Sequence, residues 1–182
     1  EGKQVVQIMA SGPDSSMEAI HRVHVSAIHA AAKRVWLTTP YFVPTEASML
    51  ALTNAALRGV DVCLLVPEKS DSRLVTAAAR SYFDELISCG VKVFEYQASM
   101  LHSKTMLVDD FLGIIGTANF DNRSFRLNYE VCAIAYGEAF NGKLAVQFQE
   151  DLKLSRRVGY ARPQPFWQRL FDSAARLCSP LL

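Results

Sequence analysis

Short apolar runs alternate with longer amphipathic stretches along most of this chain. The runs are rich in Val, Ile, Leu and aromatic residues, and turn-forming Gly, Pro, Asp and Ser residues lie between many of them, which is typical of strands buried in a sheet. We predict strands at residues 5–10, 35–39, 60–66, 91–96, 105–108, 112–117 and 129–136. Because the turn at residues 109–111 is short, the strands on either side of it should pair antiparallel.

The stretches between the runs have helical periodicity. Ser15 and Glu18 have capping-box spacing at the start of a helix that we expect to reach residue 34. Thr45 can cap a second helix that continues to Leu57. Further helices are predicted at residues 73–88, 122–127 and 139–157. Strands and helices that alternate with short connections predict a layered α/β fold in which helices flank a mixed central sheet.

Length and composition fit one domain. The chain has 182 residues, 50% of them hydrophobic, so residues 1–182 can share one substantial core. The net charge is +1, from 19 basic and 18 acidic residues, and no nucleic-acid partner is expected because polyanion binders are usually more basic. No window approaches the length of a membrane-spanning helix. The four cysteines form no C-x-x-C pair, so we expect free thiols and no zinc site.

The strand at residues 105–108 lies beside the most concentrated chemistry. His102 and Lys104 precede it and Asp109 follows it. Alternation along the strand sends His102, Lys104 and Met106 to one face. An imidazole beside an ammonium suits an anionic substrate, because the ammonium can bind a phosphate oxygen while the imidazole attacks or moves a proton. The alternative to a reactive site is that these residues have only structural roles, with His102 packed in the core, Lys104 at the surface and Asp109 in a turn.

A second polar block follows at residues 116–124, with the sequence GTANFDNRS, and continues at residues 128–130. It ends on Glu130, at the start of an apolar strand. A carboxylate is costly to bury there without a partner, and an imidazole N–H is a suitable one.

Together the two blocks resemble the signature of the phospholipase D superfamily, with H-x-K-x-x-x-x-D at residues 102–109. Longer stretches are similar to bacterial cardiolipin synthases of that superfamily, at residues 11–14, 39–44, 58–62, 69–71, 116–131 and 179–182. The likeness covers essentially the whole chain and implies a layered α-β-α phospholipase D-like fold. It also implies the second of two homologous halves, each with one motif and with membrane helices ahead of them. A chain that starts at Glu1 without Met fits that expectation.

The resemblance implies chemistry without a metal or cofactor. In the superfamily, one histidine attacks phosphorus to give a phosphohistidine and the histidine of the other motif protonates the leaving alcohol. His102 would take one of these two roles. Glu130 would orient an imidazole, usually that of the opposite half, and Asp109 would support the motif without touching substrate. The side chains that the resemblance assigns to phosphate binding are Lys104, Thr117 and Asn119.

The implied activity is phosphatidyl transfer, in which two phosphatidylglycerols, or a related donor and acceptor, give cardiolipin and glycerol. The implied partners are a phospholipid substrate, a second H-x-K-x-x-x-x-D half in the same chain or a second subunit, and a membrane surface. The implied location is the bacterial inner membrane, with the catalytic part in the cytoplasm. A lone half should be inactive or weak.

Two alternatives remain. One is a homodimeric phosphodiesterase, nuclease or phospholipase D-type hydrolase of the same superfamily. The near-neutral net charge of the chain argues against a nucleic-acid substrate for such an enzyme. The other is a non-catalytic membrane-binding module, against which the intact set of polar residues counts, namely His102, Lys104, Asn119 and Glu130.

Four further segments have open interpretations. The loop at residues 40–44 is either at a ligand site or a hydrophobic plug under the next helix, and the polar loop at residues 67–72 is either solvated or reaches a ligand. His21, His24 and His29 lack an acid or cysteine at i+4 and are expected to be solvated or partly packed. The tail after residue 165 has an apolar stripe beside arginines, which either lies at a membrane interface or, more simply, packs onto the sheet. The stripe comprises Phe166, Trp167, Leu170, Phe171, Ala174 and Leu177.

Overall fold

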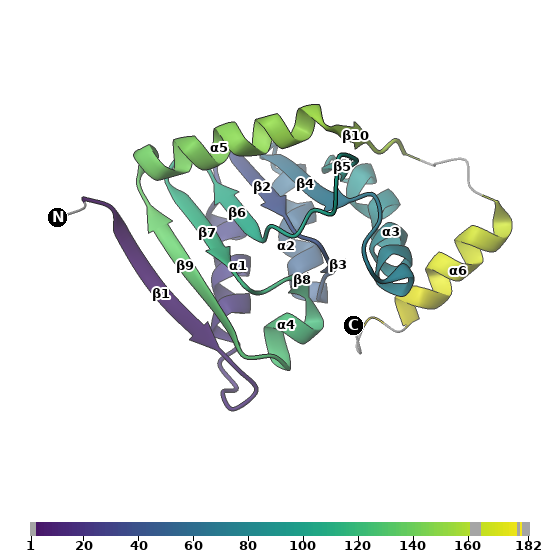
Figure 1. Cartoon of the computed structure of the whole chain (residues 1–182), viewed down its shortest axis with the longest axis horizontal. Helices are drawn as coiled ribbons and strands as arrows, with labels where there is room; N and C mark the ends of the chain where they lie inside the picture. Colours follow the sequence, from purple (N-terminus) through teal and green to yellow (C-terminus); the bar gives the residue numbers. More distant parts are fainter. Residues whose placement is uncertain (1–2, 161–164, 178, 180–182) are drawn as a thin grey trace.

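An eight-stranded mixed sheet forms the middle layer of the molecule (Figure 1). The structure is a computed structural model that describes residues 3–160, 165–177 and 179. Its elements, in chain order, are β1 (Val5–Ser11), α1 (Ala19–Ala30), β2 (Arg34–Thr38), β3 (Phe42–Val43), α2 (Glu46–Leu57), β4 (Asp61–Pro67), α3 (Arg73–Ser88), β5 (Lys92–Tyr96), β6 (Thr105–Val108), β7 (Leu112–Gly116), β8 (Phe120–Asp121), α4 (Asn122–Arg126), β9 (Glu130–Tyr136), α5 (Glu138–Lys153), β10 (Ser155–Arg157) and α6 (Phe166–Leu177).

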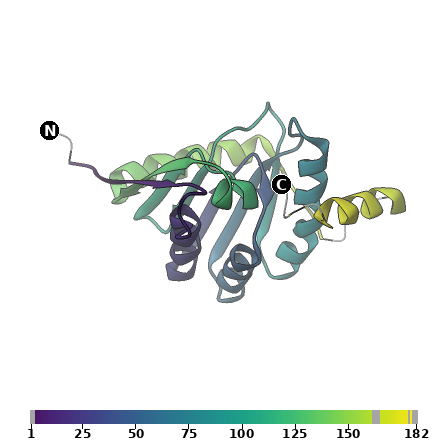
Figure 2. The ribbon, with the colours of Figure 1, turned by 90° about the horizontal axis from the view of Figure 1, so that it is seen from below.

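The strand order is β1-β9-β7-β6-β2-β4-β5-β10. β2, β4 and β5 are parallel to one another, and the other neighbours pair antiparallel. Helices α1, α2 and α3 lie on one face of the sheet and α5 crosses the other (Figure 2). The predicted layered α-β-α fold is therefore confirmed. β4 is buried on both faces, as its nearly continuous apolar sequence indicates.

Most predicted elements are found within one or two residues of their expected ends. Helix α3 has the predicted bounds, and Ser72 caps it by accepting the N–H of Val75 at 3.3 Å. Thr45 caps α2 by accepting the N–H of Ser48 at 3.1 Å. Strand β6 also has the predicted bounds and pairs antiparallel with β7.

The prediction for the start of α1 was wrong. The helix begins at Ala19, and Glu18 adopts a left-handed conformation with φ 45° and makes no side-chain cap. Its carboxylate instead accepts from Nδ1 of His21 at 3.0 Å and forms an ion pair with Arg126 at 3.0 Å. Two of the three α1 histidines, His21 and His24, are buried, so the expectation of solvated or partly packed rings holds only for His29.

Two short strand pairings were not predicted. Helix α5 ends at Lys153, four residues earlier than expected, and the chain continues as β10 along the edge of β5. β3, within the loop at residues 40–44, pairs with β8 to form a separate two-stranded sheet. Each pairing joins segments far apart in the sequence, so local periodicity does not indicate it.

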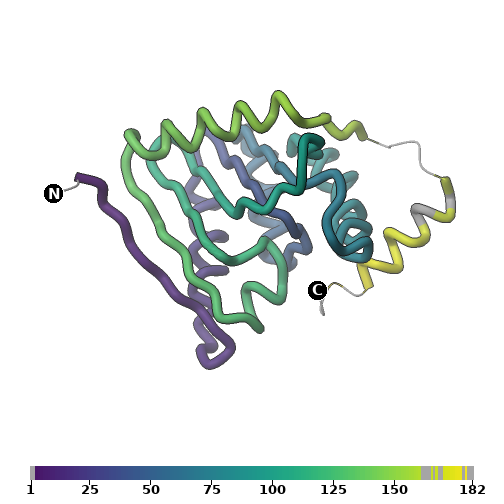
Figure 3. Tube along the Cα trace, viewed as in Figure 1, coloured from purple at the N-terminus to yellow at the C-terminus, as the bar shows by residue number. Residues whose placement is uncertain are grey.

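Helix α6 packs on α3, on the opposite side of the molecule from β1 (Figure 3). Arg176 forms an ion pair with Glu85 at 3.0 Å and lies 4.3 Å from the ring centroid of Tyr82. The simpler expectation, that the tail packs onto the sheet, was therefore wrong. Residues 180–182, which contribute to the resemblance at the C-terminus, lie outside the described residues.

Gly116 is required by the close approach of β7 to β9. A Cβ atom there would lie 2.5 Å from the backbone oxygen of Val131 and 2.7 Å from Cβ of Cys132. We predict that Gly116→Ala lowers the free energy of unfolding by about 1–3 kcal/mol in chemical denaturation, because backbone atoms must move. Gly142→Ala in α5, where no atom lies within 4 Å of the added Cβ, is the matched control and should leave stability unchanged or raise it. Equal stabilities for the Gly116→Ala variant and the original chain would contradict this account.

Candidate functional site

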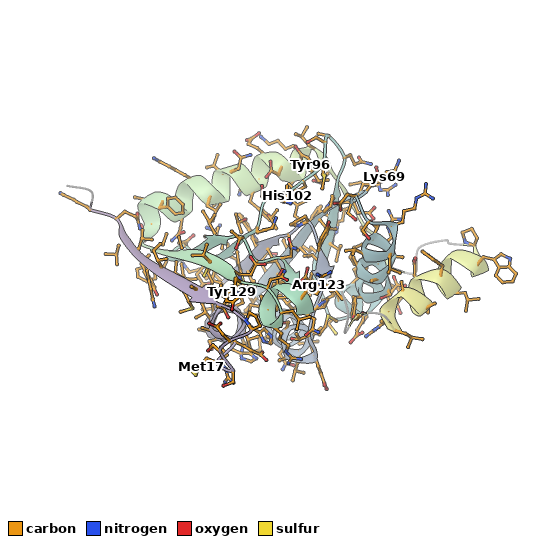
Figure 4. All side chains as sticks on the ribbon, turned by 60° about the horizontal axis from the view of Figure 1, so that its bottom comes forward. Met17, Lys69, Tyr96, His102, Arg123 and Tyr129 are labelled. Atoms are coloured by element: carbon orange, nitrogen blue, oxygen red, sulfur yellow. The ribbon has the colours of Figure 1, made fainter. Side chains whose placement is uncertain are left out.

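His102 and Lys104 meet at the start of β6, in the coil that leads into this strand from β5. Nζ of Lys104 lies 3.4 Å from Nδ1 and 3.3 Å from Nε2 of His102, and 3.0 Å from the carbonyl oxygen of His102. Leu101 is buried in the core beneath α5 and Met106 in the core beneath α1–α3, and these two anchors hold the segment. The His102 side chain is exposed (Figure 4). The predicted juxtaposition of the two side chains is confirmed.

The Lys104 ammonium is partly removed from water. Partial burial lowers the pKa of Lys104, and the negative charges of Glu130 and Asp121 oppose this effect. A cation that has lost part of its hydration gains from any anion that replaces the missing water. The site therefore favours a negatively charged group beside the imidazole of His102.

The second block folds against the first through the β6–β7 hairpin. The N–H of Asn119 donates to Oγ of Ser124 at 3.1 Å, and the N–H of Ser124 donates to Oδ1 of Asp121 at 2.7 Å. Oδ1 of Asn119 is buried and has no hydrogen-bond partner among the described residues. The hydroxyl of Thr117 donates to the carboxylate of Glu130 and accepts the N–H of Val131 at 3.0 Å.

Glu130 is oriented by two side chains. Besides Thr117, Nδ2 of Asn128 donates to Oε1 of Glu130 at 3.3 Å. In the described part of the chain, the hydrogen-bond partners found for the Glu130 carboxylate are Thr117 and Asn128. That Glu130 orients an imidazole stays a prediction.

Asp109 lies at the opposite end of β6 from Lys104. Its carboxylate accepts the backbone N–H groups of Ala32, Lys33 and Arg34, at 2.7 to 3.3 Å, where the chain enters β2. Burial raises the pKa of Asp109, but these N–H donors outweigh that effect and the pKa lies below its ordinary value. Asp109 has a φ of 53°, and so it also closes the tight turn into β7.

Sequence reasoning missed two groups close to the site. Asp121 is buried, and burial raises its pKa although Ser124 and Asn119 donate to it. The spacing of Asp121 and Ser124, typical of a helix N-cap, could have identified this carboxylate. The hydroxyl of Tyr41 donates to Asp71, and this hydrogen bond, with partial burial, raises the pKa of Tyr41 to about 12. The loops at residues 40–44 and 67–72 are thus joined to each other.

Glu130 lines an open groove of about 590 Å³. Ser11 at the end of β1, Gly12 and Asp14 from the loop after it, and Thr117 and Tyr129 from the second block also line this groove. The Tyr129 ring packs directly against Gly12, where a Cβ atom would lie 2.4 Å from the ring. In the part of the chain that the structure describes, no three His, Cys, Asp or Glu residues are arranged to hold a metal ion.

Comparison with known proteins identifies clear relatives. A family model described as "Cardiolipin synthase, PLD-like domain" matches residues 25–152. The chain is 45% identical over 184 residues to a cardiolipin synthase of Geobacillus thermodenitrificans and 46% identical over 178 residues to cardiolipin synthase A of Pseudomonas fluorescens. These alignments cover 100% and 97% of this chain and 37% of each relative, so the chain spans about a third of the length of the curated relatives that it matches.

Solved structures share the fold. Nuc from Salmonella typhimurium, a phospholipase D family member, superposes with a TM-score of 0.72 at 21% identity, covering 86% of this chain and 99% of that chain. The phosphatidylserine synthase of Haemophilus influenzae superposes with a TM-score of 0.79 at 17% identity, covering 98% of this chain and 48% of that one. The same fold therefore forms nearly all of one protein and about half of another.

The Asp109 carboxylate should stabilise the fold in a pH-dependent way. Because its pKa is below the unfolded value of about 3.9, its contribution is present above that pH and is lost as the pH falls through the folded-state pKa. We predict that Asp109→Asn costs about 1–3 kcal/mol of unfolding free energy at pH 7, with a smaller deficit in acid, in denaturation curves recorded across pH. Asp110→Asn, which removes half-exposed ion pairs with Lys33 and Arg34, should cost less than about 1 kcal/mol. A deficit for Asp109→Asn that is independent of pH would contradict the assignment.

Proposed function

The chain belongs to the phospholipase D-like family of cardiolipin synthases, and from this membership we propose that it supplies one of the two phosphate-handling motifs of a phosphatidyltransferase that forms cardiolipin. The observation that carries the proposal is the contact between the Lys104 ammonium and the exposed His102 imidazole. A phosphodiester placed there would have its charge neutralised by Lys104 while a ring nitrogen of His102 faced the phosphorus or the leaving oxygen.

The reaction proceeds in two displacements. A neutral histidine attacks phosphorus, the N–P bond forms, and the P–O bond to glycerol breaks as the histidine of the other motif gives that oxygen a proton. The second histidine then takes a proton from the hydroxyl of another phosphatidylglycerol, whose oxygen attacks phosphorus, so that a new P–O bond forms, the N–P bond breaks and the first histidine is released. His102 takes one of these two roles. Lys104 stays charged throughout and binds a phosphoryl oxygen.

Two neighbours complete the proposed phosphate site. Asn119 lies in the turn before β8, and its amide extends the set of donors around the phosphate. The Thr117 hydroxyl already donates to Glu130, so it contributes to phosphate binding only when it rotates away from that carboxylate. In the arrangement described here, Thr117 serves mainly to orient Glu130.

A second half is needed on chemical grounds. One motif offers one histidine, whereas the reaction uses two. Among residues 3–160, 165–177 and 179, the partners found for Glu130 are Thr117 and Asn128, and neither is an imidazole. Exposed apolar side chains surround this carboxylate, namely Leu127, Tyr129 and Val131, and Met100 next to the motif is also exposed. We assign this surface to a second H-x-K-x-x-x-x-D half, in the same chain or in a second subunit.

Replacing His102 tests the activity. In the complete protein, His102→Asn should lower the rate of cardiolipin formation from phosphatidylglycerol by at least about 10³-fold, because an amide neither attacks phosphorus nor transfers a proton at neutral pH. The measurement is chromatography of radiolabelled lipid products. His29→Asn, which changes an exposed ring on α1, is the matched control and should retain normal activity.

Three measurements separate the proposed function from its two alternatives. Normal activity of the His102→Asn protein would refute the proposal. Metal-independent cleavage of DNA by the isolated chain, lost on His102→Asn, would establish the homodimeric nuclease. Lipid binding without turnover in any assembly, unchanged by replacing His102, Lys104, Asn119 and Glu130, would establish a non-catalytic module.

Helix α6 supports contact with a membrane surface, and we propose that the protein works on the inner membrane from the cytoplasmic side. At 100° per residue, the apolar stripe occupies one side of α6. Trp167 is 75% exposed and Leu177 83% exposed, whereas Asp172 and Ala175 are buried. Trp167, Leu170, Phe171 and Leu177 of the stripe therefore face outward, as in helices that lie in the lipid headgroup layer. Within residues 3–160, 165–177 and 179, no helix is both long and apolar enough to cross a bilayer.

Loss of this stripe should weaken membrane binding. We predict that Trp167→Ser with Leu170→Ser lowers binding to vesicles containing phosphatidylglycerol by at least about tenfold in co-sedimentation, since each side chain buries apolar surface in lipid. Leu57→Ser, at an exposed position at the end of α2, is the control and should bind like the original chain. Equal binding of all three proteins would rule out α6 as the contact.

A further inference from the structure

His24 on α1 is an imidazole that the proposed reaction does not use. Its side chain is 7% exposed and lies among aromatic rings, 6.0 Å from the ring centroid of Phe120 and 5.6 Å from that of Phe125. Burial lowers the pKa of His24 to about 4, so the ring is neutral near pH 7. A neutral imidazole still has one N–H and one lone pair, and each needs a partner when the ring is buried.

The tautomer of His24 follows from its one hydrogen bond. Nδ1 lies 2.7 Å from the carbonyl oxygen of Ile20, and a carbonyl oxygen only accepts, so Nδ1 carries the hydrogen. Nε2 is then a lone-pair acceptor. Among the residues that the structure describes, the hydrogen bond of Nδ1 to Ile20 is the only one found for this ring.

A small cavity connects this ring to the site. His24, Lys104, Thr39 and Phe120 line it, together with the ends of β2 and β6, and its volume is about 10 Å³. A space of this size is close to the lower limit for one water molecule, and a water can occupy it where polar groups line it. The Thr39 hydroxyl is already engaged, since it donates to the carbonyl oxygen of Tyr41 and accepts the N–H of Phe120.

We propose that a water molecule in this cavity donates to Nε2 of His24 and accepts from Nζ of Lys104, which makes His24 a positioning residue for the phosphate-binding ammonium. An ammonium has three N–H donors. A neutral His102 ring has one acceptor nitrogen and takes at most one of them, and the carbonyl oxygen of His102 takes a second at 3.0 Å, which leaves the third for the water. The water gives Lys104 an acceptor on the side away from the substrate. That contact limits the directions in which the amine can turn.

His21 is the natural comparison on the same helix. It stacks on Phe125 with ring centroids 4.7 Å apart, and both of its nitrogens are engaged. Nδ1 faces Glu18 at 3.0 Å, and Nε2 faces Thr45 at 2.9 Å and Ser48 at 3.1 Å. A purely structural histidine therefore occurs one turn away, and it differs from His24 in that both of its ring nitrogens have partners.

The test is a titration of Lys104 in this 182-residue chain, followed by ¹³C and ¹⁵N NMR of the lysine side chains. A water held by His24 stabilises the ammonium, so His24→Phe should lower the pKa of Lys104 by about half to one unit, the equivalent of one net hydrogen bond. The groups that also act on Lys104, namely His102, Glu130 and Asp121, are unchanged in this variant. Phe keeps the aromatic packing, and His24→Gln, whose amide oxygen can accept from the water, should restore the original value. Lys92, paired with Asp61 at 2.7 Å, is the internal control and should not move.

Two outcomes would overturn the inference. The first is the same Lys104 pKa in His24→Phe and the original chain. The second needs no variant, and so applies even if His24→Phe does not fold: ¹⁵N spectra of the His24 ring that place the hydrogen on Nε2. The inference rests on the proposed function only in naming phosphate as the ligand of Lys104. Because the titration requires no turnover, loss of cardiolipin synthesis as the function would leave this result intact.

Discussion

A cation that is partly removed from water must be surrounded by acceptors, and the placement of Lys104 meets this requirement. Its amine lies against the imidazole and carbonyl oxygen of His102, and two carboxylates, on Glu130 and Asp121, act on it from β9 and β8. These groups stabilise the ammonium without covering it completely. A phosphodiester that bound here would place its negative charge beside the Lys104 ammonium and stabilise that ammonium further.

The fold meets this requirement by bringing separate segments to one end of the sheet. The β6–β7 hairpin places the coil of His102 beside the turn of Asn119, and β9 then returns antiparallel to bring Glu130 to the same end. Thr39, at the end of β2, bonds to the N–H of Phe120 at 3.0 Å and so attaches the second block to the central strands. Asp109 secures the other end of β6 to the start of β2.

The elements that could be predicted from the sequence are those set by local patterns. Alternation was enough to place His102 and Lys104 together, and a polar cap followed by helical spacing was enough for α3. The errors occur where distant segments compete with local preferences. Glu18 did not cap α1, because His21 and Arg126 bind its carboxylate more favourably.

The side chains that surround the site also could not be predicted from local sequence patterns. The burial of His24 depends on rings from β8 and α4, about a hundred residues away in the sequence, and the hydrogen bond between Tyr41 and Asp71 joins two loops that each look solvated by composition. The sequence showed that α6 has an apolar stripe, but it did not show that the helix would pack on α3 through the side that carries Asp172 and Ala175. Amphipathic periodicity gives the direction of an apolar face and does not identify what it contacts.

The pairing of β1 with β9 has a consequence for biosynthesis. Ser11 lies opposite Glu130 and Val5 opposite Tyr136, so this edge of the sheet joins residues more than a hundred positions apart. β1 is synthesised before β9, which is its neighbour in the sheet, so it cannot pair with β9 until that strand has emerged from the ribosome. Val5, Val6 and Ile8 add exposed apolar side chains to this strand. Until β9 is available, the backbone N–H and C=O groups of β1 can pair with a strand of another polypeptide.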